Sequence, residues 1–124
     1  AASDVYKRQD ENFPVSKLEA LGYYCSFLGQ KTYNGVAIIS KVKPKKIDYN
    51  PVNTSLNESR SIAVTIGGIT IVNLYVVNGQ DIGTDKYKHK MLWLKNLHSY
   101  AINQTLFLYV CIFYFSFFND LFFS

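Results

Sequence analysis

Residues 60–80, RSIAVTIGGITIVNLYVVNGQ, contain two apolar runs separated by a pair of glycines. The runs at 61–66 and 69–75 are rich in Ile, Val and Thr, residue types that favour strands. Gly67 and Gly68 can supply the positive φ of a two-residue primed turn. The pattern therefore predicts an antiparallel β-hairpin at the centre of the fold.

The second predicted strand ends at Tyr75, and an Asn-Gly loop follows at Asn78 and Gly79. Open α/β sheets tend to bind ligands beyond the carboxyl ends of their strands, so a phenol and a carboxamide at this point indicate where a site would lie. Two structural explanations stay open. A tyrosine at a strand end is often an amphipathic residue at the edge of the core. An asparagine before a glycine is often a turn former.

Two further strands are predicted before the hairpin. Residues 23–28 alternate in polarity, and Gly35–Ser40, GVAIIS, is a continuous apolar run; a polar loop at 29–34 joins them. The basic segment KVKPKK follows at 41–46. It either faces phosphate or forms a solvated edge that discourages strand-to-strand aggregation. Residues 48–59 are rich in Asn, Ser and Pro and predict an irregular connection.

Two helices are predicted from their start signals. Ser16 and Glu19 have the spacing of a capping box, which would open a short helix at 17–21. Residue 84 or 85 can cap a longer helix that continues to about residue 100, with most of its apolar side chains on one face. Strands together with helices predict a mixed α and β domain.

The chain has 124 residues, a formal net charge of +4 and a pI near 9.0. A mildly basic balance suits a polyanionic partner but is also common in proteins that bind none. Cys25 and Cys111 lie far apart in apolar runs and indicate core residues, so we expect a reducing, cytoplasmic location. His89 and His98 have no carboxylate or thiol at ligand spacing, and we expect both at the surface or at a helix end.

Three motifs follow one another along the chain. DENFP at 10–14 leads into the short helix, and GQKTYNGVAI at 29–38 leads into a strand. The third spans the hairpin, from Arg60-x-Ile62 to NLYVVNG at 73–79. Together they resemble the exonuclease III type of apurinic/apyrimidinic endonuclease, within the endonuclease/exonuclease/phosphatase superfamily, over roughly residues 9–100.

The resemblance implies an α/β (α+β) fold that is a fragment of a four-layer, two-sheet sandwich, with mainly antiparallel strands and flanking helices. It also implies a DNA repair hydrolase, dependent on Mg²⁺ or Mn²⁺, that cleaves phosphodiesters of double-stranded DNA at abasic sites and 3′ ends and acts as a monomer. Negative charge builds on the phosphate oxygens in such a reaction, so a metal and preorganised donors must face them.

The resemblance also assigns roles to single residues. Tyr75 matches the family's active-site tyrosine, and Asn78 matches a residue that contacts the DNA backbone. Arg60 matches an arginine whose fork of donors suits a phosphate, with a structural ion pair as the alternative. The family's loop along the duplex matches Lys31, Tyr33 and Asn34, for which a plain connection is the alternative. Such contacts position a duplex without reading its sequence.

Both ends of the chain depart from the family pattern. AASDVYKR at 1–8 stands where the family has a strand end with a metal-ligating glutamate. The aromatic tail at 102–124 lacks the family's Gly-Asp-x-Asn motif. The expected boundaries are therefore 1–8 for a non-family start, 9–101 for the partial domain and 102–124 for the tail. No metal ligand is expected in this chain.

We expect these 124 residues to be inactive alone and to self-associate, because half of a sandwich leaves large apolar faces uncovered. Two alternatives stay open. One is another phosphodiesterase of the superfamily, either a phosphatase or an RNA nuclease. The other is a non-catalytic interaction or membrane-associated protein, although the apolar run at 106–118 is shorter than the roughly 18–20 residues that a membrane span needs.

Overall fold

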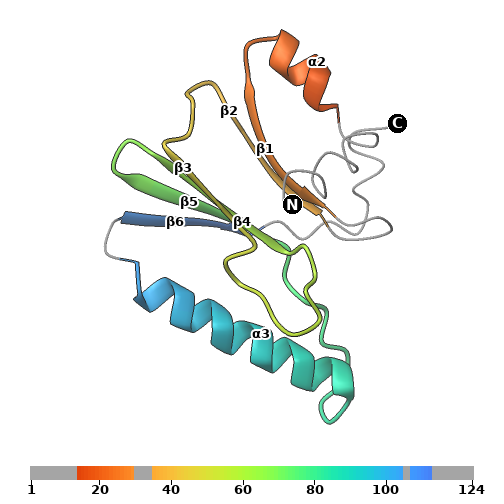
Figure 1. Ribbon diagram of the computed structural model, residues 1–124. Coiled ribbons are helices and arrows are strands. Elements are labelled where there is room, and N and C mark those ends of the chain that lie inside the picture. Colours follow the sequence, from red (N-terminus) through yellow and green to blue (C-terminus); the bar gives the residue numbers. More distant parts are fainter. Residues whose placement is uncertain (1–13, 30–34, 105–106, 113–124) are drawn as a thin grey trace.

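The computed structural model describes residues 14–29 and 35–104, and the backbone of residues 107–112. They form a two-stranded sheet, a four-stranded sheet and the long helix α3 (Asp85–Ile102), arranged in three layers (Figure 1). The four-stranded sheet is the middle layer, because one apolar cluster joins it to α3 and another joins it to the smaller sheet. This mixed architecture, with antiparallel pairing and flanking helices, confirms the predicted fold class.

The predicted hairpin forms the centre of the larger sheet. β4 (Ser61–Ile66) and β5 (Ile69–Leu74) pair antiparallel, from Ser61 opposite Leu74 to Ile66 opposite Ile69. In the turn only the first glycine, Gly67, has a positive φ, of 62°. That is the pattern of a type II′ turn, whose twist matches that of the flanking strands.

Two further strands lie at the edges of this sheet, whose order is β3-β4-β5-β6. β3 (Lys46–Tyr49) pairs antiparallel with β4, and β6 (Phe107–Ile112) pairs parallel with β5. The sequence did not predict β3. The strand is short, and it overlaps the end of the basic segment and the start of the expected connection. The connection at 48–59 is therefore irregular only after residue 49.

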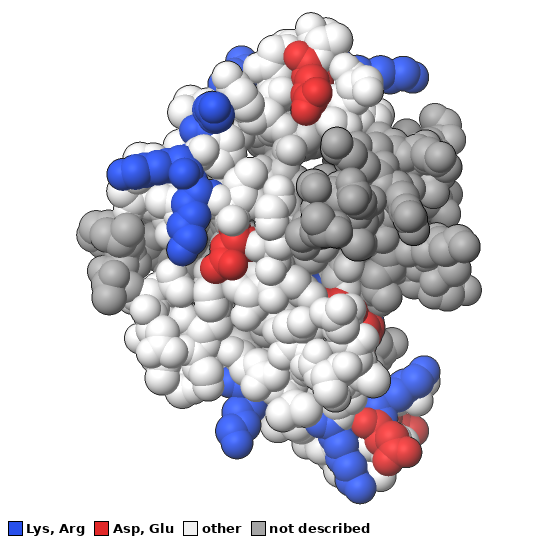
Figure 2. All heavy atoms as spheres, in the orientation of Figure 1, with Lys and Arg blue, Asp and Glu red and all other residues white. Residues whose placement is uncertain are grey.

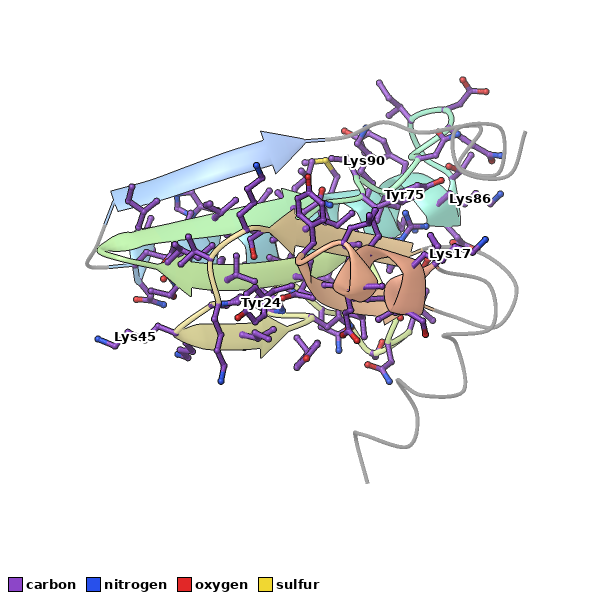
Figure 3. The ribbon with its side chains drawn as sticks, turned by 90° about the horizontal axis from the view of Figure 1, so that it is seen from above. Lys17, Tyr24, Lys45, Tyr75, Lys86 and Lys90 are labelled. Atoms are coloured by element: carbon purple, nitrogen blue, oxygen red, sulfur yellow. The ribbon has the colours of Figure 1, made fainter. Side chains whose placement is uncertain are left out.

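The lysines of the basic segment are exposed beside the edge strand β3, and Figure 2 shows them gathered over the connection between β2 and β3. Lys45 and Tyr75 lie at opposite ends of the sheet (Figure 3). Lys45 is bonded through its main-chain nitrogen to Thr65 near the hairpin turn. Lysines on an edge strand hinder pairing with another chain, so this placement favours the solvated-edge interpretation.

The smaller sheet covers one face of the central hairpin. β1 (Tyr24–Gly29) and β2 (Gly35–Ser40) pair antiparallel, with Leu28 opposite Val36. Leu28 and Val36 pack with Ile62 of β4 in a buried cluster. Half of a sandwich was expected to leave apolar faces uncovered. On this face, however, β1 and β2 lie against β4, β2 also contacts β5, and Asn73 bonds to β2.

Helix α3 covers the opposite face. Its only buried residue, Trp93, packs with Ala63, Val72 and Leu74 of the hairpin. The side chain of Thr84 accepts a hydrogen bond of 3.1 Å from the main chain of Tyr87, which confirms the predicted N-cap. None of the helices within the described residues is long and apolar enough to cross a membrane.

The short helix α2 (Val15–Ala20) begins earlier than the sequence predicted. Its N-cap is Pro14, with no side-chain cap bond, so the expected capping box of Ser16 and Glu19 is wrong. The carbonyl of Pro14 accepts from the main chain of Leu18, which sets the first turn one residue before Ser16. The predicted start at 1–8 and most of the predicted tail lie outside the described residues.

Candidate active site

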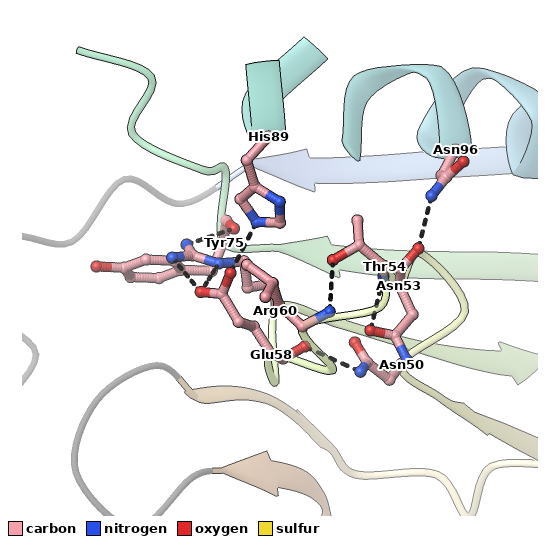
Figure 4. A network of polar contacts seen from close by, with 9 residues as sticks. Asn50, Asn53, Thr54, Glu58, Arg60, Tyr75, His89 and Asn96 are labelled. Carbon is pink, nitrogen blue, oxygen red and sulfur yellow. Dashed lines mark hydrogen bonds and ion pairs between the residues drawn. The ribbon is translucent and has the colours of Figure 1, made fainter. Parts of the chain in front are cut away.

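Tyr75 lies directly after the last residue of β5, at the end of the sheet away from the hairpin turn. Its main-chain nitrogen donates a hydrogen bond of 2.8 Å to the carbonyl of Arg60, which extends the pairing of the two strands by one step. The half-buried ring packs against the cluster of Leu28, Val36 and Ile62. The hydroxyl points away from the polar contacts around Arg60 (Figure 4). The phenol is thus anchored through its main chain, and its hydroxyl is directed away from Arg60.

The guanidinium of Arg60 lies over the Tyr75 ring, 4.9 Å from its centre, at a distance typical of a cation–π contact. Nη1 donates to the Tyr75 carbonyl at 3.4 Å. Nε and Nη2 each lie 2.7 Å from Oε2 of Glu58. The structure therefore shows the ion pair that was the alternative to a phosphate contact, and the phosphate contact stays a prediction.

Glu58 also contacts helix α3. Its Oε1 lies 2.8 Å from Nε2 of His89, and the side chains of Glu58 and His89 are 21 % and 18 % exposed. His89 was expected at the surface or at a helix end, but its side chain is partly buried against a carboxylate 31 residues earlier in the chain, a partner that no local spacing could reveal. Burial by itself raises the pKa of Glu58, but the hydrogen bonds and charges of Arg60 and His89 outweigh it and lower the pKa overall.

The loop that carries Glu58 is held by its own polar contacts. The Glu58 carbonyl accepts a 2.9 Å bond from the side chain of Asn50, and Ser61 donates to Asn50 at 3.2 Å. Asn96 of α3 donates to the carbonyl of Asn53 at 2.7 Å. Bonds to β4 and to α3 therefore fix the loop before any ligand binds.

The Asn-Gly loop after Tyr75 packs against the start of α3. Asn78 is exposed, and its side-chain oxygen accepts from the main chain of Gln80 at 3.3 Å, as in a turn former. Gly79 is buried, and a Cβ at this position would lie 2.6 Å from Cδ of Lys90. A larger residue here would require the Lys90 side chain to shift. Asn78 is thereby presented to solvent at the end of the sheet that bears Tyr75.

The structure brings Tyr75 and Arg60 together and leaves Asn78 in the adjoining loop. The other predicted residues, Lys31, Tyr33 and Asn34, lie outside the described residues. Their flanking strands are described: Leu28 and Val36, near the two ends of that loop, belong to the cluster on which Tyr75 packs. The loop therefore begins and ends near this edge. Sequence reasoning missed Glu58 and His89 because both signals depend on contacts between distant segments.

Among residues 14–29 and 35–104, no group of three or more His, Cys, Asp and Glu side chains could hold a metal ion. Glu58 and His89 form a pair, and the carboxylate is already shared with Arg60. The described side chains therefore do not fit a divalent cation. A donor set for one would need groups outside them.

No model of a known protein family matches the chain. Among curated proteins it is similar to the exodeoxyribonuclease III of Haemophilus influenzae, with 31% identity over 100 residues. The match covers 76% of this chain and 38% of that protein.

Three solved structures share the fold and part of the sequence. A 3'-5' exonuclease of Neisseria meningitidis, NExo, is 37% identical with a TM-score of 0.68, and the match covers 75% of this chain and 36% of NExo. Another structure, a Neisseria NExo described as a 3' phosphatase, is bound to a product DNA hairpin, with 36% identity, a TM-score of 0.65 and the same coverage. An AP endonuclease of Archaeoglobus fulgidus is 31% identical with a TM-score of 0.73, covering 84% of this chain and 42% of that one. The chain thus spans less than half the length of each relative.

Proposed function

The chain corresponds in sequence and fold to part of an exonuclease III-type apurinic/apyrimidinic endonuclease, and from this premise we propose that its full-length parent is a DNA repair nuclease. The proposed reaction is metal-dependent hydrolysis of phosphodiesters in double-stranded DNA, at abasic sites and at 3′ ends. The observation that carries it is the placement of Tyr75 at the end of β5, beside Arg60 and the exposed Asn78, in a chain similar to these enzymes.

In this proposal Tyr75 contacts the scissile phosphate. Negative charge grows on the phosphate oxygens as water attacks, and a fixed hydroxyl aimed at one of them stabilises the transition state more than the ground state. The ring is held by main-chain bonding to Arg60 and by the apolar cluster, and its hydroxyl points away from Arg60. A donor held in this way needs little reorganisation during the reaction.

The remaining predicted residues would position the duplex. Asn78 is exposed and can donate through its carboxamide to a backbone phosphate without rearrangement of the loop. The loop between β1 and β2 would supply Lys31, Tyr33 and Asn34 from the same edge. Contacts of this kind fix register on DNA and carry no sequence preference, which suits an enzyme that searches for a lesion.

Mg²⁺ or Mn²⁺ would neutralise charge on the phosphate in the parent protein. The described residues do not form its binding site, so we propose that the ligands belong to other segments of the parent. For the same reason we propose that the 124 residues alone do not hydrolyse DNA.

A second candidate activity is removal of a 3' phosphate, which the name of a Neisseria relative favours. The test incubates the parent with Mg²⁺ and, separately, an abasic duplex, a recessed 3′ hydroxyl end and a 3′-phosphate end of one sequence. Cleavage at the abasic site supports the endonuclease, and release of inorganic phosphate alone supports the phosphatase. No reaction with any of the three would contradict both and leave a non-catalytic interaction protein.

A further inference from the structure

Two separate parts of the chain meet at Glu58, the connection between β3 and β4 and helix α3. The residue lies in the connection between β3 and β4, Arg60 directly precedes β4, and His89 lies on α3 (Figure 4). Both carboxylate oxygens are engaged, Oε2 by Arg60 at 2.7 Å and Oε1 by His89 at 2.8 Å. The backbone of Glu58 is itself held by the 2.9 Å bond from Asn50. The carboxylate is therefore fixed from its own connection and from the helix.

The donors of Arg60 are largely committed to these partners. Nε and Nη2 face Glu58, Nη1 faces the Tyr75 carbonyl, and the guanidinium plane lies over the ring. The Arg60 side chain is only 12 % exposed. A bidentate contact with a phosphate uses two parallel N–H donors, so Arg60 could offer its Nε–Nη2 edge to DNA only by releasing Glu58.

We infer that Glu58 and His89 are positioning residues, which hold Arg60 against Tyr75 so that Arg60 orients the phenol and does not contact DNA phosphate. The inference rests on the proposed function in one respect, that Tyr75 acts on the substrate. It assigns Glu58 and His89 a task that the sequence motifs do not include.

The physical reason for such a unit lies in the position of Tyr75. The residue directly follows the last residue of β5, and its main chain is bonded to Arg60. An apolar cluster contacts the ring, and the guanidinium covers it. A catalytic donor has to be held to within about 0.5 Å, and a displacement of about 1 Å can reduce a rate about 10²-fold. The contact with Glu58 keeps the Arg60 guanidinium over the Tyr75 ring. The contact with His89 keeps the Glu58 carboxylate against Arg60.

The first test does not depend on activity. The full-length parent is labelled with 3-fluorotyrosine, and the Tyr75 resonance is identified by its loss in Tyr75→Phe. In the absence of DNA, we expect Glu58→Ala and His89→Phe to shift and broaden this resonance. Glu58→Gln, which keeps the shape and one acceptor, should preserve it better than Glu58→Ala. The matched control is Glu19→Ala, which removes an exposed carboxylate on α2 and should leave the resonance unchanged.

The second test separates positioning from phosphate contact on an abasic duplex. We expect Glu58→Ala to lower kcat by about 10-fold to 10²-fold, with an unchanged KM and an unchanged dependence of DNA binding on salt. Arg60→Gln should behave alike, and the double variant should be no slower than the slower single variant, because the residues act as one unit. If Arg60 contacts a phosphate, Arg60→Gln would instead weaken DNA binding and reduce the slope of its salt dependence by about 1.

The inference is overturned if Glu58→Ala, or Glu58→Gln where the alanine variant does not fold, leaves both the Tyr75 resonance and kcat as in the wild type. It is equally overturned if Arg60→Gln reduces the salt slope by about 1 at unchanged kcat. A wild-type parent that cleaves no substrate would refute the proposed nuclease, while the fluorine resonances would still decide whether Glu58 and His89 position Tyr75.

Discussion

Asn73 on β5 donates a hydrogen bond of 2.8 Å to the carbonyl of Ala37 on β2, so a single side chain joins the two sheets. Its strand partner is Ile62, whose side chain belongs to the cluster between the sheets. Asn73 lies two residues before Tyr75, and Ala37 lies three residues after the loop that carries Lys31, Tyr33 and Asn34. The bond therefore fixes β2 relative to β5, the strand that leads to Tyr75.

Asn73→Ala is expected to destabilise the parent by about 1–3 kcal/mol, because a half-buried carbonyl of Ala37 loses its donor. Urea denaturation measures the change. Asn103→Ala, which alters an exposed asparagine at the C-cap of α3, is the control and should change stability less. Equal effects of the two substitutions would show that the bond between the sheets contributes nothing particular.

Gly79→Ala is expected to destabilise the parent by about 1 kcal/mol, the low end of the range for overpacking, because the flexible Lys90 side chain can shift. The new Cβ would lie 2.6 Å from Cδ and 3.3 Å from Cβ of Lys90, so either that side chain or the loop bearing Asn78 must move. Lys90→Ala in the same protein removes the clash and should restore most of the loss. Additive effects in the double variant would contradict this account of the close approach.

Glu58 should contribute to the acid stability of the fold. Its pKa is lowered in the folded state through Arg60 and His89 against the effect of burial. A carboxyl with a lowered folded pKa stabilises the fold above its unfolded pKa, about 4.3 for glutamate, and this contribution is lost as the pH falls through the folded pKa. Glu58→Gln should therefore reduce stability near neutral pH and flatten the decline below about pH 4.3. Parallel curves of wild type and variant from pH 3 to 7 would refute this linkage.

The local pattern was sufficient for some elements. The glycine pair between two β-branched runs predicted β4 and β5, and Thr84 predicted the start of α3, because neighbouring residues determine turns and caps. Tyr75 could be placed at a strand end for the same reason. Its surroundings could not, since Glu58 and His89 are 31 residues apart and meet only after α3 docks on the sheet.

The elements that the sequence did not predict correctly, β3 and the start of α2, depend on more than the local pattern. β3 is a four-residue edge strand flanked by lysines, and pairing with β4 stabilises it more than its own sequence does. Ser16 and Glu19 have the spacing of a capping box, but α2 begins before Ser16. The Pro14 carbonyl already accepts the first main-chain hydrogen bond of the helix.

The proposed role of Tyr75 is tested most directly by single-turnover cleavage of an abasic duplex by the full-length parent and its Tyr75→Phe variant. The substitution removes one hydroxyl and keeps the ring that packs on Leu28, Val36 and Ile62. Tyr24→Phe, at an exposed tyrosine on β1, is the matched control. We predict a loss of about 10²–10³-fold for Tyr75→Phe, the scale for one transition-state donor, and none for Tyr24→Phe. Equal cleavage rates for wild type and Tyr75→Phe would contradict the assignment of Tyr75 to the active site.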